Sequence, residues 1–262
     1  MVDAALARAA DFVRRAGSPA ELARLAYLLG EKPDEAQVAA LLAGQRADGG
    51  FPPSWSPDYS SIDGTCFRLA QAEQAGLSPS RPELSPAMAF LARRQRRDGS
   101  WAEDVAQAAV APPWAQPGQA MSEIYLTANA GSWVMRGGDL HAARKASQVL
   151  RSRLDADGTL PSFLHANWLA AGLFWGMGDR PAAEKLLQHL LRRVSDISAS
   201  GLAWMVVSLL GCGVDPRHAL VAEARSAMLL CQRDDGAFPS EDGPDDDVYA
   251  TLEAVHALRA PR

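Results

Sequence analysis

The chain has 262 residues, of which 48% are hydrophobic and 22% are charged, as in ordinary globular proteins. This composition excludes a disordered, collagen-like or fibrous chain, and the length allows a sizeable core without disulfides or metals. The net charge of −5 and the absence of a basic block argue against nucleic acid as a partner.

The predicted elements, in chain order, are six pairs of helices. Strong helix starts are predicted at Ser18-Pro19-Ala20-Glu21, Asp34, Ser85-Pro86 and Asp215-Pro216. No strand-like alternation competes with the helical spacing, so the chain is predicted to be all-α. The pairs are expected near residues 3–30, 34–76, 85–137, 139–178, 181–212 and 216–260.

A turn containing Asp-Gly recurs along the chain. Its aspartates lie 50, 59 and 78 residues apart, and half of the last gap points to a degenerate copy at Asp196. Repeats of this period indicate an array or a closed ring of hairpins. We therefore predict a single domain over residues 1–262, with these four turns: 45–51, 95–101, 154–160 and 232–238.

Three further stretches stand out from the repeats. Residues 159–178 and 197–214 carry no charge, but His165, Asn167 and several glycines and serines interrupt them. We predict buried helices there and no integral membrane span. The long connection over residues 102–119, rich in Ala, Pro and Gln, is expected to be a surface loop over one mouth of the ring.

The cysteines and the residue usage indicate a cellular compartment and a kind of source organism. Three cysteines lie far apart and form no C-x-x-C or His/Cys cluster, which argues against zinc and against a disulfide framework. A reducing cytoplasm fits this pattern, and no secretory signal is evident near Asp3 and Asp11. The Ala-rich helices, with more Arg than Lys, suggest a bacterial source.

One copy of the turn carries a resemblance to a known family. Phe90-Leu91-x3-Gln95-x3-Gly99-x-Trp101 resembles the QW repeat of triterpene cyclases, a repeat family that includes protein prenyltransferase β subunits. The resemblance implies an (α/α)6 toroid, a barrel of six helical hairpins around a central apolar cavity. Physically, Gln ties a helix end to the turn, Gly permits the turn and Trp packs over it.

The same resemblance implies a candidate acid. Class II cyclases protonate an alkene or epoxide from the third residue of Asp-x-Asp-Asp-Thr-Ala, and Ser61-Ile62-Asp63-Gly64-Thr65-Cys66 is the best gapless match. Asp63 falls on the acid position, while Ser61 and Gly64 replace the motif's other carboxylates. The alternative is that Asp63 caps the helix that follows it.

A second candidate lies in Pro244-Asp-Asp-Asp-Val-Tyr-Ala-Thr251. Alignment on Thr251 places Tyr249 on the acid position, and Asp247 level with Ser61 and with Glu123. We expect Asp63, Glu123 and Asp247 to face one mouth of the cavity, where burial would raise their pKa values. The alternative for the acidic run is a solvated helix cap.

Aromatic and polar side chains on the expected inner helices are candidates for substrate binding. Aromatic faces stabilise carbocations by cation–π attraction, whereas the alternative for each of them is core packing. The polar candidates are either cavity donors or hydrogen-bonded core groups. The set comprises Phe67, Tyr125, Trp133, His165, Asn167, Trp168, Phe174, Trp204 and Tyr249.

These signals predict a class II terpene cyclase-like enzyme that cyclises a linear isoprenoid or polyene by acid catalysis. No metal or redox cofactor is expected, with Mg²⁺ entering only if the substrate carries a diphosphate. The alternatives are a non-catalytic toroid that binds an apolar small molecule or a partner protein, a prenyltransferase β-like protein, and a carbohydrate enzyme using Glu123 and Asp247. Ala250 replaces the family's zinc-binding His, against the prenyltransferase. The sequence predicts no oligomeric state.

Overall fold

A computed structural model of the chain describes residues 2–259, so the last residue of the expected sixth helix pair lies outside the described part. Within it the protein is all-α, as predicted, with no strand. Its helices are α1 Val2–Ala16, α2 Pro19–Leu28, α3 Glu35–Leu42, α4 Ile62–Gln74, α5 Ser85–Arg94, α6 Ala120–Arg136, α7 Leu140–Ser152, α8 Leu164–Gly176, α9 Arg180–Leu191, α10 Ala199–Gly211, α11 Ala219–Leu230 and α12 Asp247–Arg259. Short 3-10 helices are η1 Pro82–Leu84, η2 Val105–Gln107, η3 Pro113–Ala115, η4 Val194–Asp196 and η5 Pro244–Asp246.

The six predicted helix pairs are confirmed, and two of the four predicted starts hold as expected. At α2, Ser18 accepts a hydrogen bond from the Glu21 amide while the Glu21 carboxylate accepts from the Ser18 amide, which completes a capping box. At α3, Asp34 Oδ1 accepts from the amides of Ala36 and Gln37 at 3.0 and 3.1 Å. These bonds satisfy amides that have no partner inside the helix.

The other two starts lack the expected cap. α5 begins at Ser85, as predicted, but without a side-chain cap, because η1 leads directly into the helix and Leu84 occupies the cap position. α11 begins at Ala219, where His218 Nδ1 accepts the Leu220 amide, and Asp215 instead closes the preceding turn by accepting the Arg217 amide. The capping preference of Asp215 therefore predicted the turn that precedes α11 and not the first helical residue.

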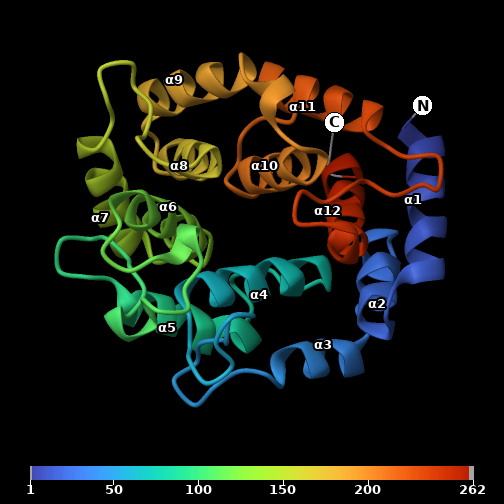
Figure 1. The fold of residues 1–262 in the computed structure, drawn as a ribbon, viewed down its shortest axis with the longest axis horizontal. Helices are drawn as coiled ribbons and strands as arrows, with labels where there is room; N and C mark the ends of the chain where they lie inside the picture. The colour runs from blue at the N-terminus through green and yellow to red at the C-terminus, as the bar shows by residue number, and fades with distance from the viewer. Residues whose placement is uncertain (1, 260–262) are drawn as a thin grey trace. The chain divides into compact units, whose positions relative to one another are not determined.

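The chain folds into two compact units. The first comprises residues 1–41, 71–76 and 188–262, and the second comprises 42–70 and 77–187. The expectation of one domain over the whole chain stays a prediction. In the first unit, α12 lies between α2 and α10, while α1 packs on α12 and α2 and α11 packs on α10 and α12 (Figure 1).

The second unit has the same two-layer construction. α6 and α8 lie side by side, α7 packs against both of them, and α5 and η3 pack on α6 (Figure 1). The inner helices α6 and α8 are buried over most of their length, whereas α7 buries a stripe of Ala and Leu and exposes its charged face. An almost wholly apolar helix under an amphipathic one is the arrangement that the sequence predicted.

The recurring turn has a consistent hydrogen-bonding pattern. Gln95 Nε2 donates to the carbonyls of Gly99 and Ala142 at 3.0 and 2.9 Å, so it ties the end of α5 to the turn and to α7. Gly99 has a φ of +97°, and a Cβ there would lie 2.9 Å from the Lys145 carbonyl oxygen, which only glycine avoids. Gln45 and Gln232 donate to their turn glycines in the same way.

Each turn is also anchored to the inner helix that follows it. The backbone amides of Phe51, Trp101 and Phe238 donate to the hydroxyls of Thr65, Thr127 and Thr251 at 2.9–3.0 Å. In the remaining turn, the Leu160 amide donates to Asn167 Oδ1 at 2.8 Å. The bonds to the three threonines confirm the predicted register, in which Asp63, Tyr125 and Tyr249 lie two residues before the anchor. The structure adds Asn167 as a fourth anchor, which places His165 at the same level.

The two uncharged stretches form α8 and α10, which are 13 residues long each and mostly buried. Within residues 2–259, no helix combines the length and the apolar character needed to cross a membrane. The degenerate copy predicted at Asp196 does not form the recurring turn. That aspartate lies in η4 and pairs with Arg193 at 2.6 Å.

Candidate active site

Asp63 lies in the first turn of α4, and two donors hold its carboxyl group. Tyr125 of α6 donates its hydroxyl to Asp63 Oδ1 at 2.5 Å, and Trp114 of η3 donates its indole N–H to Oδ2 at 3.1 Å. All three residues belong to the second unit. Each carboxyl oxygen therefore has one fixed partner, and Asp63 retains part of its surface accessible.

Asp63 does not serve as the helix cap, which was the alternative interpretation. The hydroxyl of Ser61 accepts the Gly64 amide at 3.0 Å, and the buried carboxylate of Glu103 accepts the amides of Ile62 and Asp63 at 3.2 and 3.0 Å. Because these groups satisfy the start of α4, the Asp63 side chain is left to its contacts with Tyr125 and Trp114.

The surroundings of Asp63 favour its protonated form. Burial raises the pKa of Asp63 to about 6, hydrogen bonds from Tyr125 and Trp114 oppose this rise, and the nearby charge of Glu103 adds to it. A carboxyl group with this pKa is partly protonated near neutral pH. The two donors also hold it in a single orientation, as a general acid requires.

An aromatic cluster adjoins the acid on α6 and the start of α8. The His165 ring lies 4.6 Å from the Tyr125 ring, edge to face, and stacks on Phe163 at 5.2 Å. Trp168 meets His165 at 5.8 Å, also edge to face. Burial lowers the pKa of His165 to about 4, so the imidazole is neutral and does not repel a cation. Three of the predicted binding residues are thus brought together, and one of them, Tyr125, is bonded to Asp63.

Glu123 is not joined to Asp63 by any hydrogen bond in the described part of the chain. Its carboxylate forms ion pairs with Arg96 at 2.9 Å and Arg153 at 3.4 Å at the start of α6. The partly exposed Glu123 carboxylate therefore links the start of α6 to the residues that follow α5 and α7. Its predicted catalytic role stays a prediction.

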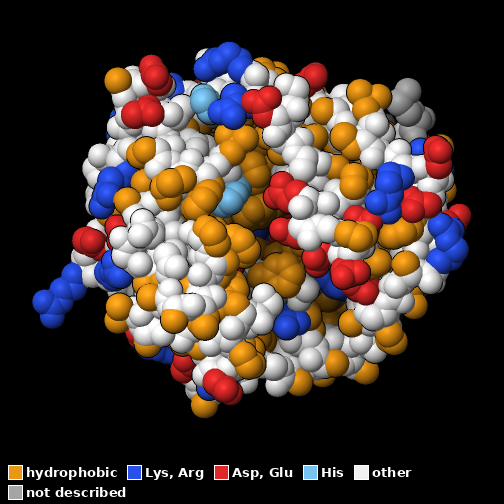
Figure 2. Space-filling model, viewed as in Figure 1, with side chains coloured by type: hydrophobic (Ala, Val, Ile, Leu, Met, Phe, Trp, Pro, Cys, Tyr) orange, Lys and Arg blue, Asp and Glu red, His pale blue; other side chains and the backbone are white. Residues whose placement is uncertain are grey.

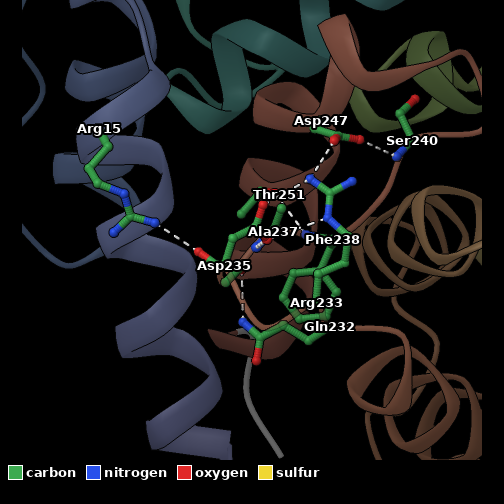
Figure 3. Close-up of polar contacts among 10 residues, drawn as sticks. Arg15, Gln232, Arg233, Asp235, Ala237, Phe238, Ser240, Asp247 and Thr251 are labelled. Atoms are coloured by element: carbon green, nitrogen blue, oxygen red, sulfur yellow. Dashed lines mark hydrogen bonds and ion pairs between the residues drawn. The ribbon is translucent and has the colours of Figure 1, made fainter.

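Asp247, the third predicted carboxylate, lies in the first unit at the start of α12. It is buried, Arg233 lies 2.7 Å from its Oδ2, and the Ser240 amide donates to its Oδ1 at 2.8 Å (Figure 3). The expected alternative of a solvated cap fits the exposed Asp245 and Asp246 and does not fit Asp247. Arg96–Glu123 and Arg233–Asp247 are equivalent pairs in the repeat, because each arginine directly follows the turn glutamine.

The remaining predicted binding residues have varied surroundings. Phe67 is 46% exposed and follows Asp63 by one turn of α4, whereas Phe174 is fully buried in α8. Trp133 is buried near the end of α6 under Arg136. Trp204 and Tyr249, in the first unit, are half-buried. Asn167 bonds the backbone of its own turn, at Leu160 and Phe163, which is the core role given as its alternative.

Apolar side chains are also exposed on α4, η3 and α6, the elements that carry the acid and its two donors. Phe67, Trp114 and Met121 are all more than one-third exposed. Figure 2 shows hydrophobic side chains gathered over α6 and α8 on the face in view. Trp114 packs edge to face on Trp55 at 6.4 Å, so the indole that bonds Asp63 is itself held by a second indole.

Sequence reasoning missed Glu103 and Trp114, both of which lie in the connection that was expected to be a surface loop. Glu103 follows the motif residue Trp101 by two positions, and Trp114 is the one aromatic residue in residues 102–119. Those two features were the available signals. Within residues 2–259 no group of three His, Cys, Asp or Glu side chains is arranged to hold a metal ion.

A further buried carboxyl group that sequence reasoning missed, Glu253, lies in the first unit. Glu253 of α12 accepts hydrogen bonds from Gln74 Nε2 and from the Tyr249 hydroxyl, and Gln74 Oε1 accepts from Arg24 at 3.1 Å. Burial and the nearby Glu73 raise the pKa of Glu253 to about 7 against these hydrogen bonds and Arg24. Burial also lowers the pKa of the Arg24 guanidinium.

The helix pairs, the anchored turns and the site on α4 define an all-helical protein with the terpene cyclase-like (α/α)6 toroid fold. Comparison with solved structures shows this fold. A protein from Actinoplanes is similar over 99% of this chain and 99% of its own, with 17% identity and a TM-score of 0.67. No protein-family model and no curated protein matches the chain.

The type II terpene cyclase MstE from Scytonema shows the same likeness. Its apo structure is similar over 98% of this chain and 97% of its own, with 16% identity and a TM-score of 0.63. A variant of MstE in complex with its substrate, geranylgeranyl dihydroxybenzoate, is similar over 98% of this chain and 96% of its own, with 16% identity and a TM-score of 0.60. These similarities confirm the predicted fold class.

Proposed function

We propose that this chain is a class II terpene cyclase-like enzyme that cyclises a linear isoprenoid or polyene after protonating it from Asp63. The observation that carries the proposal is the Asp63 carboxyl group, held by Tyr125 and Trp114 and with a pKa raised to about 6. The fold it shares with MstE supports the same chemistry.

The chemical step balances without an added cofactor. The Asp63 O–H bond breaks and its proton bonds to a terminal alkene carbon or to an epoxide oxygen, whose C–O bond then breaks as the next double bond attacks the electron-poor carbon. The final cation loses a proton to solvent and Asp63 takes one up from solvent, so the product is isomeric with the substrate. The carboxylate left on Asp63 keeps two hydrogen-bond donors, which stabilise the charge that forms during the transfer.

The aromatic cluster would stabilise the cation. The ring faces of Tyr125, Phe163 and Trp168 attract positive charge, and the neutral His165 among them does not oppose it. We propose that the partner is an apolar small molecule and that Mg²⁺ enters only with a diphosphate substrate. The protein is proposed to act in the cytoplasm, in keeping with the lack of a disulfide among Cys66, Cys212 and Cys231.

A product assay tests the proposal. Purified protein is incubated, with and without Mg²⁺, with linear isoprenoid alcohols, their diphosphates, squalene and geranylgeranyl-substituted arenes, and products are read by gas chromatography–mass spectrometry. We expect isomeric cyclic products and a loss of at least about 100-fold in Asp63→Asn, which keeps the shape and removes the acid. Glu83→Gln, on the exposed η1, is the matched control.

Two results would contradict the proposal. Saturable binding of these compounds without turnover would identify the alternative, a toroid that binds an apolar ligand. Wild-type turnover in Asp63→Asn would place the acid elsewhere, with Asp247 and Glu123 as the next residues to substitute.

A further inference from the structure

The acid segment lacks the neighbouring carboxylates of the motif that it resembles, because Ser61 and Gly64 occupy their positions. The structure supplies a carboxylate from another repeat. Glu103, two residues after the aromatic residue of the next turn, reaches back to the first turn of α4 and is almost completely buried. Nothing in the local sequence of α4 indicates this contact.

Four donors surround the Glu103 carboxylate. Its Oε1 accepts from the Ser61 hydroxyl at 2.7 Å and the Asp63 amide at 3.0 Å. Its Oε2 accepts from the Tyr59 hydroxyl at 2.9 Å and the Ile62 amide at 3.2 Å. A protonated carboxyl group would turn an O–H toward one of these donors, so the arrangement fits an ionised Glu103 at the positive end of the helix.

Asp63 and Glu103 therefore form an unequal pair. Glu103 has four donors for its charge, while Asp63 has two, and the charge on Glu103 disfavours a second charge on Asp63. Two carboxyl groups whose surroundings differ in this way divide into one ionised and one protonated member. The same contact fixes the backbone amide of Asp63 and with it the direction of its side chain.

We propose that Glu103 is the positioning residue of the acid. Its carboxylate takes the place of the carboxylates missing from the motif, holds the first turn of α4 and keeps the proton on Asp63. Its importance for turnover rests on the proposed function, whereas its effect on Asp63 does not depend on turnover.

The test is a titration of Asp63 in protein labelled with ¹³C at the aspartate carboxyls, with Asp63→Asn used to assign the signal. In Glu103→Gln, which removes the charge and nearly preserves the shape, we expect the pKa of Asp63 to fall by roughly one unit. Glu83→Gln is the control and leaves the titration unchanged. An unchanged Asp63 titration in folded Glu103→Gln overturns the proposal.

A second measurement avoids a variant that fails to fold. In wild-type protein, we expect the backbone amides of Ile62 and Asp63 to be protected from hydrogen exchange, because both donate to the buried Glu103 carboxylate. Rapid exchange of both amides would show that Glu103 does not hold the first turn of α4 and would overturn the proposal.

Turnover gives an independent readout. With an active substrate, the decline of activity at high pH moves to lower pH in Glu103→Gln, because Asp63 loses its proton more easily. A purely structural role would lower activity at every pH without moving the profile. If no substrate turns over but the Asp63 titration shifts as expected, the proposed function fails and the role of Glu103 stands.

Discussion

In each of the two units, a carboxyl group accepts a hydrogen bond from a tyrosine of an inner helix. In the second unit Tyr125 donates to Asp63, and in the first unit Tyr249 donates to Glu253. The two tyrosines occupy the same position in the repeat, two residues before the threonine that anchors the turn. Burial is the main cause of the raised pKa in both carboxyl groups, to about 6 in Asp63 and about 7 in Glu253.

The two carboxyl groups differ in access and in partners. Glu253 is 3% exposed and is bonded by Gln74, whose other end bonds Arg24, so every direction around it is occupied by protein. Asp63 remains partly accessible and is bonded by a hydroxyl and an indole N–H. A raised pKa alone therefore does not identify an acid. Access together with oriented donors favours Asp63 as the acid and Glu253 as part of a structural network.

The largest expected effect is a loss of stability when the Glu253 network of the first unit is broken. Arg24→Met removes the cation from the Glu253 network, and we expect the free energy of unfolding at pH 8 to fall by about 4 kcal/mol, as for other broken buried charge networks. The loss becomes smaller below pH 7, because Glu253 then takes up a proton. Denaturant titrations at pH 6 and pH 8 measure both values.

Arg14→Met is the matched control for this prediction. Arg14 forms an exposed ion pair with Asp11 at 2.9 Å, and such pairs contribute less than about 1 kcal/mol. Equal losses in the two variants would show that the Glu253 network is not a stabilising element of the first unit.

The second effect is on the pH dependence of stability. The pKa of Glu253 rises from 4.5 to about 7 on folding, so between these values the folded protein holds a proton that the unfolded chain has lost. Stability therefore falls as pH rises through this window, by up to about 3 kcal/mol from Glu253. Denaturant titrations across pH 4 to 8 should show this slope, and Glu253→Gln should flatten it.

Asp63→Asn sharpens the same comparison. The pKa of Asp63 rises from 3.8 to about 6 on folding, so its contribution falls in a lower window. The variant should flatten the curve below pH 6 and leave the slope between pH 6 and pH 7 in place. A slope that is unchanged in both variants would refute the raised pKa values.

The smallest effect concerns the acid itself. Tyr125→Phe removes a donor that favours the ionised form of Asp63, so the pKa of Asp63 should rise and activity should persist to higher pH. The maximum rate should fall about tenfold, because the carboxylate formed by proton transfer loses a hydrogen bond. Rate measurements from pH 5 to pH 8 test both. A shift of the profile to lower pH would contradict the assignment, and Glu103→Gln provides that opposite shift for comparison.

Much of the fold could be predicted because it depends on local, periodic signals. The capping box at Ser18, the apolar helices within residues 159–178 and 197–214, and the glycine turns each act over a few residues. The start at Ser85 was correctly placed but lacks the expected side-chain cap, because a 3-10 turn leads into the helix. The start at Asp215 was misplaced, because that residue closes a turn before the helix.

The candidate site was predictable only at the positions that the repeat itself aligns. Alignment on the anchor threonines placed Asp63, Tyr125 and Tyr249 at one level, and the hydrogen bonds from Phe51, Trp101 and Phe238 confirm it. The corresponding place of His165 emerged only from the Leu160–Asn167 bond. The contacts of Asp63 with Trp114 and Glu103 join residues 51 and 40 positions apart, and no periodic signal connects them.

The sequence by itself determined the all-helical class, the six helix pairs and the register of the three inner helices aligned on threonine, because helix periodicity, capping and glycine turns are local properties of the chain. Only the tertiary structure decided which acidic residue stays partly exposed, which donors hold its carboxyl group and which carboxylate lies beside it. Burial and long-range hydrogen bonds set the ionisation of Asp63 and Glu253, and both arise from packing between segments distant in sequence.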